Sequence, residues 1–325
     1  MNDLEVLGPT ALPLAGVELG GTKCVVTLAH DPQTVLDQRV VPTEAPEETL
    51  AALVEIMSEW QRTIGFRALG IASFGPIDLN PASASFGAVL KTNKPGWSGA
   101  DVLHVLSKPF GLPTEFDTDV NGAALAEIRW GCARGFDDFA YVTVGTGIGV
   151  GLIVHGRPTR GIGHSEIGHL RLPRLPGDRQ ESVCRFHDDC VEGLASGTAL
   201  LARLGDGRTV EEVSADDPVW TPIVEALVVM CHDLVCTTGP QRIAIGGGVV
   251  SKQPHLIERI NRALVESLNG YFDLPEQYAY IVAPALGAAA GPLGSIALAA
   301  NAFTRASSGG DVEAHPAPNQ PEHAG

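Results

Sequence analysis

Cysteine and histidine residues with metal-ligand spacing lie in one polar segment of the chain. Cys184, His187 and Cys190 are three residues apart, and His169 lies upstream. Two thiolates and two imidazoles satisfy tetrahedral zinc, and the C-x2-H-x2-C spacing lets one tight loop supply three ligands while a neighbouring strand supplies the fourth. The alternative is a pair of ordinary thiols beside surface histidines, which the polarity of the segment disfavours. The spacing therefore indicates a metal site, but not whether the metal is structural or catalytic.

A glycine turn that could face an anion follows the first predicted strand. The run AGVELGGTKCVVTLAHD reads as strand, turn and strand, with Gly20 and Gly21 in the turn and Thr22 and Lys23 after them. Glycine lets backbone N–H groups approach a phosphate, while the threonine adds a hydroxyl and the lysine a charge. The same residues could also form a plain hairpin. On its own, this turn is an equivocal phosphate signal.

A second hairpin of the same kind occupies residues 139–156, FAYVTVGTGIGVGLIVHG, with Gly145, Thr146 and Gly147 in its turn. The two hairpins are about 120 residues apart, and each opens one half of the chain. Such similarity predicts an internally duplicated α/β fold with a nucleotide held between the halves.

Two carboxylates lie where an extended segment passes into a helix at about Asn121. Asp117 and Asp119 are two residues apart, so we expect them to share one face of the extended part. Asp119 is predicted just before the helix N-terminus, where the N–H dipole should hold its carboxylate ionised. The alternative role for Asp119 is simple helix capping.

A third glycine-rich turn ends the predicted strand in RIAIGGGVVSK, where Gly246, Gly247 and Gly248 precede a helix expected from about Pro254 to Asn269. A strand-to-helix turn without side chains could lie against a purine or its ribose. The alternative is an ordinary crossover loop.

The bulk composition limits the classes of function. The chain has 325 residues, 44% of them hydrophobic, so it can bury a sizeable core in two domains or one large α/β unit. A net charge of −16 argues against a nucleic-acid partner. Six cysteines in a chain of this size favour a reducing cytoplasm, and the acidic N-terminus does not resemble a secretory signal. The apolar window 219–236 contains three polar residues, which predicts a buried helix and no membrane span.

The remaining elements are expected to position these groups. A helix should open at Pro46 and stop at Gly65, and ALGIASFGPIDLNP should be a buried strand that ends at a Gly75-Pro76 turn. In the following loop, Trp97 could cover a small polar ligand or merely pack. The last ordered element should be a helix over residues 285–303, and residues 305–325 should be disordered.

Taken together and in this order, the motifs resemble the ROK family of sugar kinases, and within it the zinc-containing bacterial fructokinases. The resemblance rests on GVELGGTK, ASFGPIDLNP, KPGW, DTDVNGAALAE, VGTGIGVG, SEIGH, CRFHDDCVEGLASG and IGGGVV, spread over roughly residues 14–300. It implies the two-domain actin-like fold of the actin, hexokinase and Hsp70 class. The implied division is a lead-in at 1–13, a small domain at 14–118 completed by the last helix, and a large domain at 119–284.

The resemblance also implies roles for individual residues. Asp119 would be the general base that takes a proton from a sugar hydroxyl as it attacks the γ-phosphate of ATP. The hairpin turns would be the two phosphate loops, and Gly246 to Gly248 the adenosine-side loop. The implied sugar contacts are Gly75, Asn93, Thr118 and Glu166, and the implied ligands of a closed structural zinc site are His169, Cys184, His187 and Cys190. Mg²⁺ would enter bound to ATP.

The resemblance leaves the sugar partly open. Many fructokinases carry proline where this chain has Asn93, and other ROK kinases use asparagine to bind a hexose; Ser165 also stands where proline is frequent. D-fructose, converted to fructose 6-phosphate, is the expected substrate, with mannose or glucose as alternatives. A sugar-responsive ROK repressor would need a DNA-binding domain before the first hairpin, where the chain has only about 15 residues. The resemblance further implies a homodimer, and the composition already favours a cytoplasmic protein without a nucleic-acid or membrane partner.

Overall fold

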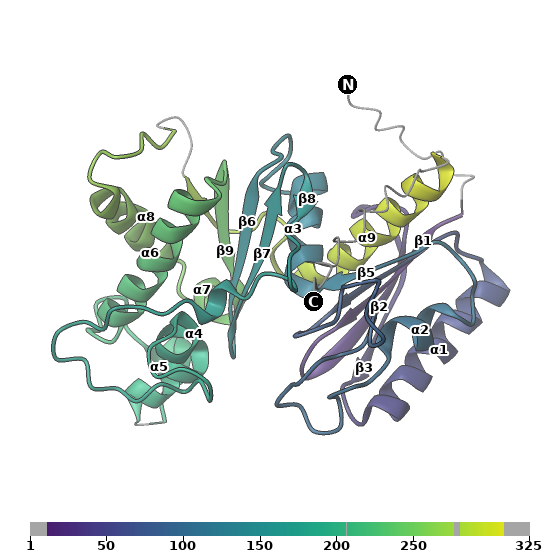
Figure 1. Ribbon diagram of the computed structural model, residues 1–325, viewed down its shortest axis with the longest axis horizontal. Helices are drawn as coiled ribbons and strands as arrows, with labels where there is room; N and C mark the ends of the chain where they lie inside the picture. Colours follow the sequence, from purple (N-terminus) through teal and green to yellow (C-terminus); the bar gives the residue numbers. More distant parts are fainter. Residues whose placement is uncertain (1–11, 206, 276–279, 309–325) are drawn as a thin grey trace, which may run out of the picture.

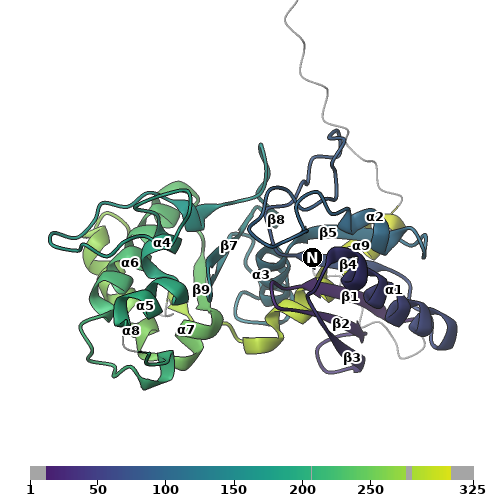
Figure 2. The same cartoon turned by 90° about the horizontal axis from the view of Figure 1, so that it is seen from below.

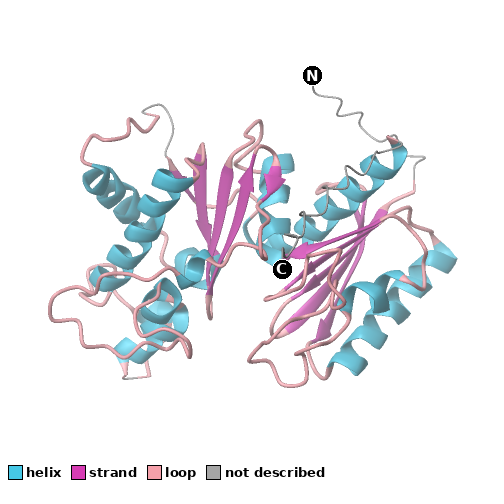
Figure 3. Cartoon of the chain, viewed as in Figure 1, coloured by secondary structure: helices cyan, strands magenta, loops and turns pink. Residues whose placement is uncertain are grey.

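The protein contains two five-stranded sheets, each belonging to one half of the chain (Figures 1 and 3). The computed structural model describes residues 12–205, 207–275 and 280–308. The first sheet has the order β3-β2-β1-β4-β5, and the second has the order β10-β9-β6-β7-β8. The strands of the first are β1 Leu14–Leu19, β2 Lys23–Ala29, β3 Val35–Pro42, β4 Leu69–Ser73 and β5 Thr114–Thr118. Those of the second are β6 Phe139–Val144, β7 Ile148–Val154, β8 Arg157–Pro158, β9 Arg242–Gly246 and β10 Ile281–Val282.

The two sheets repeat one topology. In each, the first three strands form an antiparallel meander, and the last two strands add in parallel on the far side of the first strand. Both predicted glycine hairpins are confirmed as the β1–β2 and β6–β7 pairs. The predicted duplicated α/β fold is therefore confirmed, because the second half repeats the first strand by strand.

Helices cover both faces of the first sheet. On one face, α1 (Pro46–Thr63) buries Leu53, Met57 and Trp60 against β1 and β2, with α2 (Val102–Ser107) beside it. The spacing of these apolar residues and proline in the first turn explain why α1 forms where it was expected. The opposite face is covered by α9 (Ala290–Ser307), which packs on β1, β4 and β5 (Figure 1).

The second sheet is also covered on both faces. Its outer face packs on α4 (Val191–Ala195), α6 (Trp220–Thr237) and α8 (His255–Leu268), with α5 (Gly197–Leu204) and α7 (Gly247–Lys252) at the ends of the strands. Three short 3-10 segments complete the described elements, at Ile167–His169, Val210–Glu212 and Gly287–Ala289. Among the described residues, α6 alone is long and apolar enough to cross a membrane. It is a core helix, with 56% of the window buried inside the protein.

Each of the two helices between the sheets packs on the sheet of the other half of the chain. Although α3 (Asp119–Trp130) follows the first sheet in the chain, it packs on β6 and β7 of the second. Conversely, α9 follows the second sheet and packs on the first, and α3 and α9 lie against each other (Figure 2). Gly122 and Gly294 meet at this crossing, where a Cβ on Gly294 would lie 2.5 Å from the carbonyl carbon of Gly122. The two halves therefore meet through backbone in close contact.

Several predicted element boundaries are wrong. The helix expected at about Asn121 begins at Asp119, because the Thr118 side chain caps it by accepting a hydrogen bond from the Asn121 N–H. A helix, α7, begins directly at Gly247, inside the turn that was expected to be a loop. The last helix begins at Ala290 and continues to Ser307, so the disorder predicted from residue 305 is wrong for residues 305–307.

Residues 309–325 of the predicted tail and residues 1–11 of the lead-in lie outside the described residues. The domain limits at 118/119 and 284 also stay predictions, although both fall where the chain passes from one half to the other.

Candidate functional site

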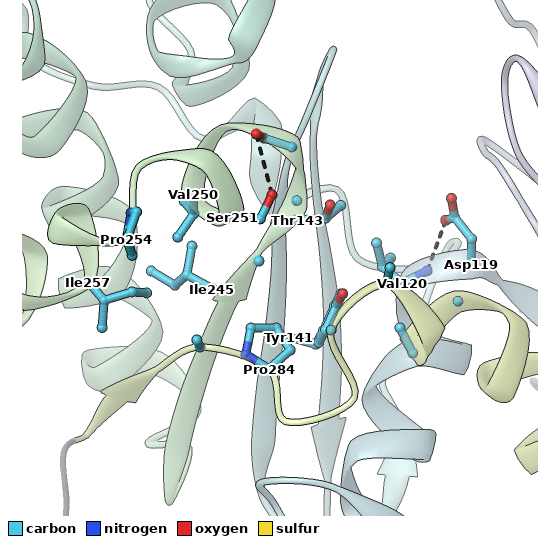
Figure 4. Close-up of a pocket in the computed structure, with 18 of the residues that line it drawn as sticks. Asp119, Val120, Tyr141, Thr143, Ile245, Val250, Ser251, Pro254, Ile257 and Pro284 are labelled. Atoms are coloured by element: carbon cyan, nitrogen blue, oxygen red, sulfur yellow. Dashed lines mark hydrogen bonds between the residues drawn. The ribbon is translucent and has the colours of Figure 1, made fainter. Parts of the chain in front are cut away.

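A cavity of about 710 Å³ lies between the two halves (Figure 4). Glu18 enters it from the end of β1, and Asp119 from the first residue of α3. Figure 4 shows apolar side chains at the end of the cavity opposite Asp119. These residues are Ile245, Val250, Pro254 and Ile257. The cavity thus has one end with a carboxylate and one end suited to a flat apolar group.

Burial, and not the helix N-terminus, dominates the ionisation of Asp119. Its Oδ1 accepts a hydrogen bond from the Val120 N–H at 2.9 Å, which favours the ionised form. Removal of water around the carboxylate outweighs that bond, and the negative charge of Glu166 adds to it, so the pKa of Asp119 rises to about 6. The start of the helix therefore favours the ionised carboxylate, as predicted, but burial outweighs it and raises the pKa, which the sequence did not predict.

Asp117 and Asp119 do not share a face. Asp117 belongs to β5, and its side chain is fully buried in an ion pair with Arg160 and a hydrogen bond from Asn121 Nδ2 at 2.8 Å. Asn121 Oδ1 in turn accepts from the Leu152 N–H at 3.2 Å. Because α3 starts at Asp119, the two carboxylates point in different directions. Asp117 fastens β5, α3 and β7 together, while only Asp119 lines the cavity.

The first hairpin turn is fixed through its carbonyl groups. Gly20 O accepts from the Thr43 hydroxyl at 2.8 Å, and Gly21 O accepts from the Lys94 ammonium. Thr22 and Lys23 are exposed, and a side chain at Gly21 would meet nothing within 4 Å. The turn therefore has a fixed backbone and open space on one side, as an anion-binding loop needs. The turn residues do not line the cavity, but Glu18, two residues before Gly20, does.

The second hairpin turn is fixed by the start of α5. Gly145 O accepts from the Gly197 N–H at 2.7 Å, and the carbonyl of Thr146 accepts from the Thr198 hydroxyl at 2.8 Å. Gly147 lies against the Glu192 carboxylate, which accepts from the Ile148 N–H at 3.0 Å. Of this hairpin, Tyr141 and Thr143 on β6 reach the cavity, and the turn lies outside its wall.

The third predicted turn lines the cavity directly. Gly246, Gly247 and Gly248 all belong to its wall, together with Pro284 and Ala288 from the segment before α9. Gly247 has φ +88°, and a Cβ there would lie 2.5 Å from the backbone N and O of Val144. Only glycine fits this position, because β9 must turn into α7 against the end of β6.

The predicted sugar contacts lie on both sides of the cleft. Thr118 is buried, and its hydroxyl is engaged in capping α3. Glu166 is exposed and close enough to Asp119 to raise its pKa. Gly75 lies against the His164 ring, and Asn93 Oδ1 accepts from Arg185 Nη1 at 3.2 Å across the two halves.

Trp97 packs and does not cover the cavity. Its side chain is fully buried, stacks edge-on against Phe74, and donates to the Glu44 carbonyl at 2.9 Å. It holds the loop that carries Asn93 onto the start of α1. The alternative of a ligand-covering Trp97 is therefore wrong.

The four predicted metal ligands converge. One ligand atom from each of His169, Cys184, His187 and Cys190 lies within 4.8 Å of the others. The Cys184 and Cys190 sulfurs are each 3.7 Å from His169 Nδ1. Tetrahedral zinc with its usual bond lengths would place a sulfur and a nitrogen roughly 3.5 Å apart. The donor set and its spacing therefore fit a zinc ion held by four protein ligands.

Sequence reasoning missed Glu18 and His164. Glu18 is the penultimate residue of β1, just before the glycine turn, and burial together with the charge of Asp119 raises its pKa to about 7. An acidic residue at the end of an otherwise buried strand was the available signal. His164, by contrast, is recognised only through its contact with Ile77, far away in the chain.

With this geometry in place, comparison with known proteins identifies the family. The profile of the ROK family matches residues 14–302. The chain belongs to the ROK family. It is 38% identical to the fructokinase of Pediococcus pentosaceus, covering 90% of this chain and 99% of the relative. It is 40% identical to the fructokinase of Zymomonas mobilis, covering 87% and 95%.

Among solved structures, a ROK glucokinase from Streptomyces griseus in complex with glucose and AMPPNP superposes with a TM-score of 0.69. It is 25% identical, and the match covers 89% of this chain and 99% of that one. The two sheets and the cleft between them thus form the two-domain actin-like fold of ROK sugar kinases.

Proposed function

We propose that this protein is an ATP-dependent hexose kinase that converts D-fructose to fructose 6-phosphate. The observation that carries the proposal is the single cavity wall shared by Asp119 and the Gly246–Gly248 turn, which would bring a carboxylate and a nucleotide together between the halves. The Streptomyces relative was solved with both a sugar and an ATP analogue. Fructose is the first choice because the relatives from Pediococcus and Zymomonas are fructokinases.

The chemistry asks little covalent work of the protein, because phosphoryl transfer depends mainly on positioning and charge stabilisation. Asp119 would accept the proton of the sugar hydroxyl as that oxygen attacks the γ-phosphate. Its raised pKa suits this role, since a base that titrates near the working pH both exists in the ionised form and binds the proton firmly. The backbone N–H groups of the hairpin turns would face the phosphates. The apolar end of the cavity would receive the purine.

Glu18 and Asp119 are the carboxylates that could contact Mg²⁺ accompanying ATP, directly or through water. Both line the cavity, and the charge of Asp119 contributes to the raised pKa of Glu18. A divalent cation would relieve this unfavourable pairing of negative charges. Magnesium usually keeps several waters and is held largely by substrate phosphates, so two carboxylates suffice for the fit.

A structural zinc ion in the cluster of His169, Cys184, His187 and Cys190 is part of the proposal. Four protein ligands leave no position for a reacting water, so the metal would act by fixing the loop. The backbone N–H of His169 donates to the carbonyl of Glu166 at 2.9 Å. A metal ion that fixes His169 would therefore also fix the backbone of Glu166, a predicted sugar contact. Arg185, between two ligands, reaches Asn93 in the other half.

The oligomeric state is a prediction from family resemblance, and the compartment is a prediction from the cysteine content. A homodimer would be detected by light scattering of the purified protein across a range of concentrations. A cytoplasmic location fits the six cysteines, none of which forms a disulfide within the described residues.

An ADP-release assay over a panel of hexoses tests the activity. Fructose should give the highest kcat/KM, and Asp119→Ala should abolish most of it. Asp216→Asn should not, because Asp216 is an exposed carboxylate that does not line the cavity. Higher turnover of mannose or glucose would change the substrate but keep the chemistry. Absence of turnover with every hexose, or an Asp119→Ala enzyme as active as the wild type, would refute the proposed function.

A further inference from the structure

His164 joins the two halves of the protein on the sugar side of the cleft. It lies between β8 and the Ile167–His169 turn, two residues before Glu166, and its side chain is only 7% exposed. Its Nε2 accepts a hydrogen bond from the backbone N–H of Ile77 at 3.1 Å. Ile77 belongs to the first half, just after the Gly75-Pro76 turn that follows β4. One nearly buried ring therefore spans the cleft.

The hydrogen bond to Ile77 also fixes the position of the proton on the ring. Because Nε2 accepts, it carries no proton, and in the neutral ring the proton resides on Nδ1. Nδ1 lies 3.2 Å from the carbonyl oxygen of Ser165 and 3.5 Å from Glu166 Oε1. The donor side of the ring thus faces Glu166, whose side chain is otherwise 52% exposed.

The ring also packs on Gly75. A Cβ at Gly75 would lie 3.2 Å from Cε1 and 3.4 Å from Nε2 of His164. Any side chain at position 75 would therefore push against the imidazole. The ring contacts one predicted sugar residue from each half, namely Gly75 and Glu166.

We propose that His164 is a positioning residue for the sugar. It holds the Gly75 turn of the first half and Glu166 of the second half in one hydrogen-bonded unit. The contacts that the two halves make with the hexose are then correctly placed relative to each other before the sugar binds. No proton transfer to substrate is involved. The inference rests on the proposed function, because Gly75 and Glu166 contact a hexose only if the protein binds one. The competing explanation is a buried histidine that stabilises the fold without affecting the sugar.

Three substitutions separate these explanations. In His164→Gln, the side-chain oxygen can reach about the position of Nε2 and can still accept from Ile77. In His164→Asn, the shorter side chain reaches only about as far as Nδ1, and His164→Ala removes both atoms. His232→Ala is the control, because it also removes a histidine that links two elements, here through the hydrogen bond between His232 of α6 and Ser267 of α8.

Steady-state kinetics with fructose and ATP give the first readout. His164→Ala and His164→Asn should raise the KM for fructose roughly 3- to 10-fold, the effect of losing one or two neutral hydrogen bonds. The KM for ATP should change by less than about 2-fold in the same enzymes, because His164 is not part of the nucleotide cavity wall. His164→Gln and His232→Ala should stay within about 2-fold of the wild type for both substrates.

Amide hydrogen exchange gives a readout that does not depend on activity. Exchange in a peptide spanning residues 74–79 should be faster in His164→Ala and His164→Asn than in the wild type, and unchanged in His164→Gln. If no hexose is turned over by the wild type, the proposed function fails, and this exchange still decides whether His164 holds Ile77. Faster exchange with an unchanged fructose KM would overturn the positioning role. So would equal rises in both KM values, or a Gln variant that behaves like the Ala variant.

Discussion

Replacing Asp119 by asparagine should have opposite effects on activity and stability. Asparagine keeps an oxygen that can accept the hydrogen bond from Val120, so the start of α3 should remain intact. It cannot take a proton from the sugar, and we expect kcat/KM to fall roughly 10²- to 10⁴-fold. A loss of activity through misfolding would be accompanied by a loss of stability, whereas here the stability should rise.

The gain in stability follows from the raised pKa. Asp119 titrates near 3.8 when unfolded and at about 6 when folded, so the folded state binds the proton more tightly. The free energy of unfolding therefore decreases as the pH rises from about 4 to about 6, and above that range the ionised carboxylate destabilises the fold. The shift of about 2 units corresponds to at most about 3 kcal/mol. Because Asp119 is partly exposed to the cleft, we expect roughly 1–2 kcal/mol.

Two measurements on the same protein test this prediction. Urea unfolding should show Asp119→Asn to be more stable than the wild type at pH 8 and similar to it at pH 4. The pH profile of kcat/KM should lose its acidic limb, expected near pH 6 in the wild type, where protonation removes the base. Activity of the variant within 10-fold of the wild type would refute the role of Asp119 as base. A variant less stable than the wild type at pH 8 would refute the argument from burial.

Three further changes probe the zinc site, the contact between α3 and α9, and the surroundings of the magnesium ion. Cys184→Ser should lower the zinc content below one ion per chain and weaken fructose binding more than ATP binding, measured by separate titrations of the two ligands. An unchanged zinc content would contradict the proposed site. Gly294→Ala should cost about 1–3 kcal/mol in urea unfolding, because its Cβ would lie 2.5 Å from the Gly122 carbonyl carbon, whereas Gly161→Ala, with open space around it, should cost little. Glu18→Gln should raise the Mg²⁺ concentration needed for half-maximal rate, measured by titrating Mg²⁺ at fixed ATP, and an unchanged requirement would exclude Glu18 from the cation's surroundings.

Local patterns predicted the hairpins and the helix α1 because the forces that form them are local. The β1–β2 and β6–β7 turns contain glycine between largely apolar strands, and α1 begins at Pro46 and carries apolar residues at helical spacing. The end of α9 could not be found in this way. Arg305 in its last turns forms an ion pair with Glu115 of β5, and Phe303 packs under the Arg67 guanidinium. These partners lie far away in the sequence, so the local sequence around residue 305 alone predicts only a polar tail.

The same limit applies to the candidate site. The sequence places an acidic residue near a helix start, but the sign of the pKa shift at Asp119 depends on how much water the second half excludes. Glu18 was missed for a related reason. Its carboxylate lies against Gly291 of α9, a contact made only because the last helix returns to the first sheet. Motif spacing identified which residues could react, and the tertiary fold determined which of them face one another.

The exchange of α3 and α9 between the sheets has a consequence for how the cleft can move. Asp119 is the first residue of α3, which packs on the second sheet. Glu18 is the penultimate residue of β1 in the first sheet and contacts α9. A rotation of one half against the other must therefore change the distance between these two carboxylates, which both line the cavity. The hydrogen bond from the Ile77 N–H to His164 joins the two halves, so it would break if they separated. Closing the cleft would then bring together the base, the cation-binding carboxylate and the sugar contacts in one movement, and opening it would disperse them.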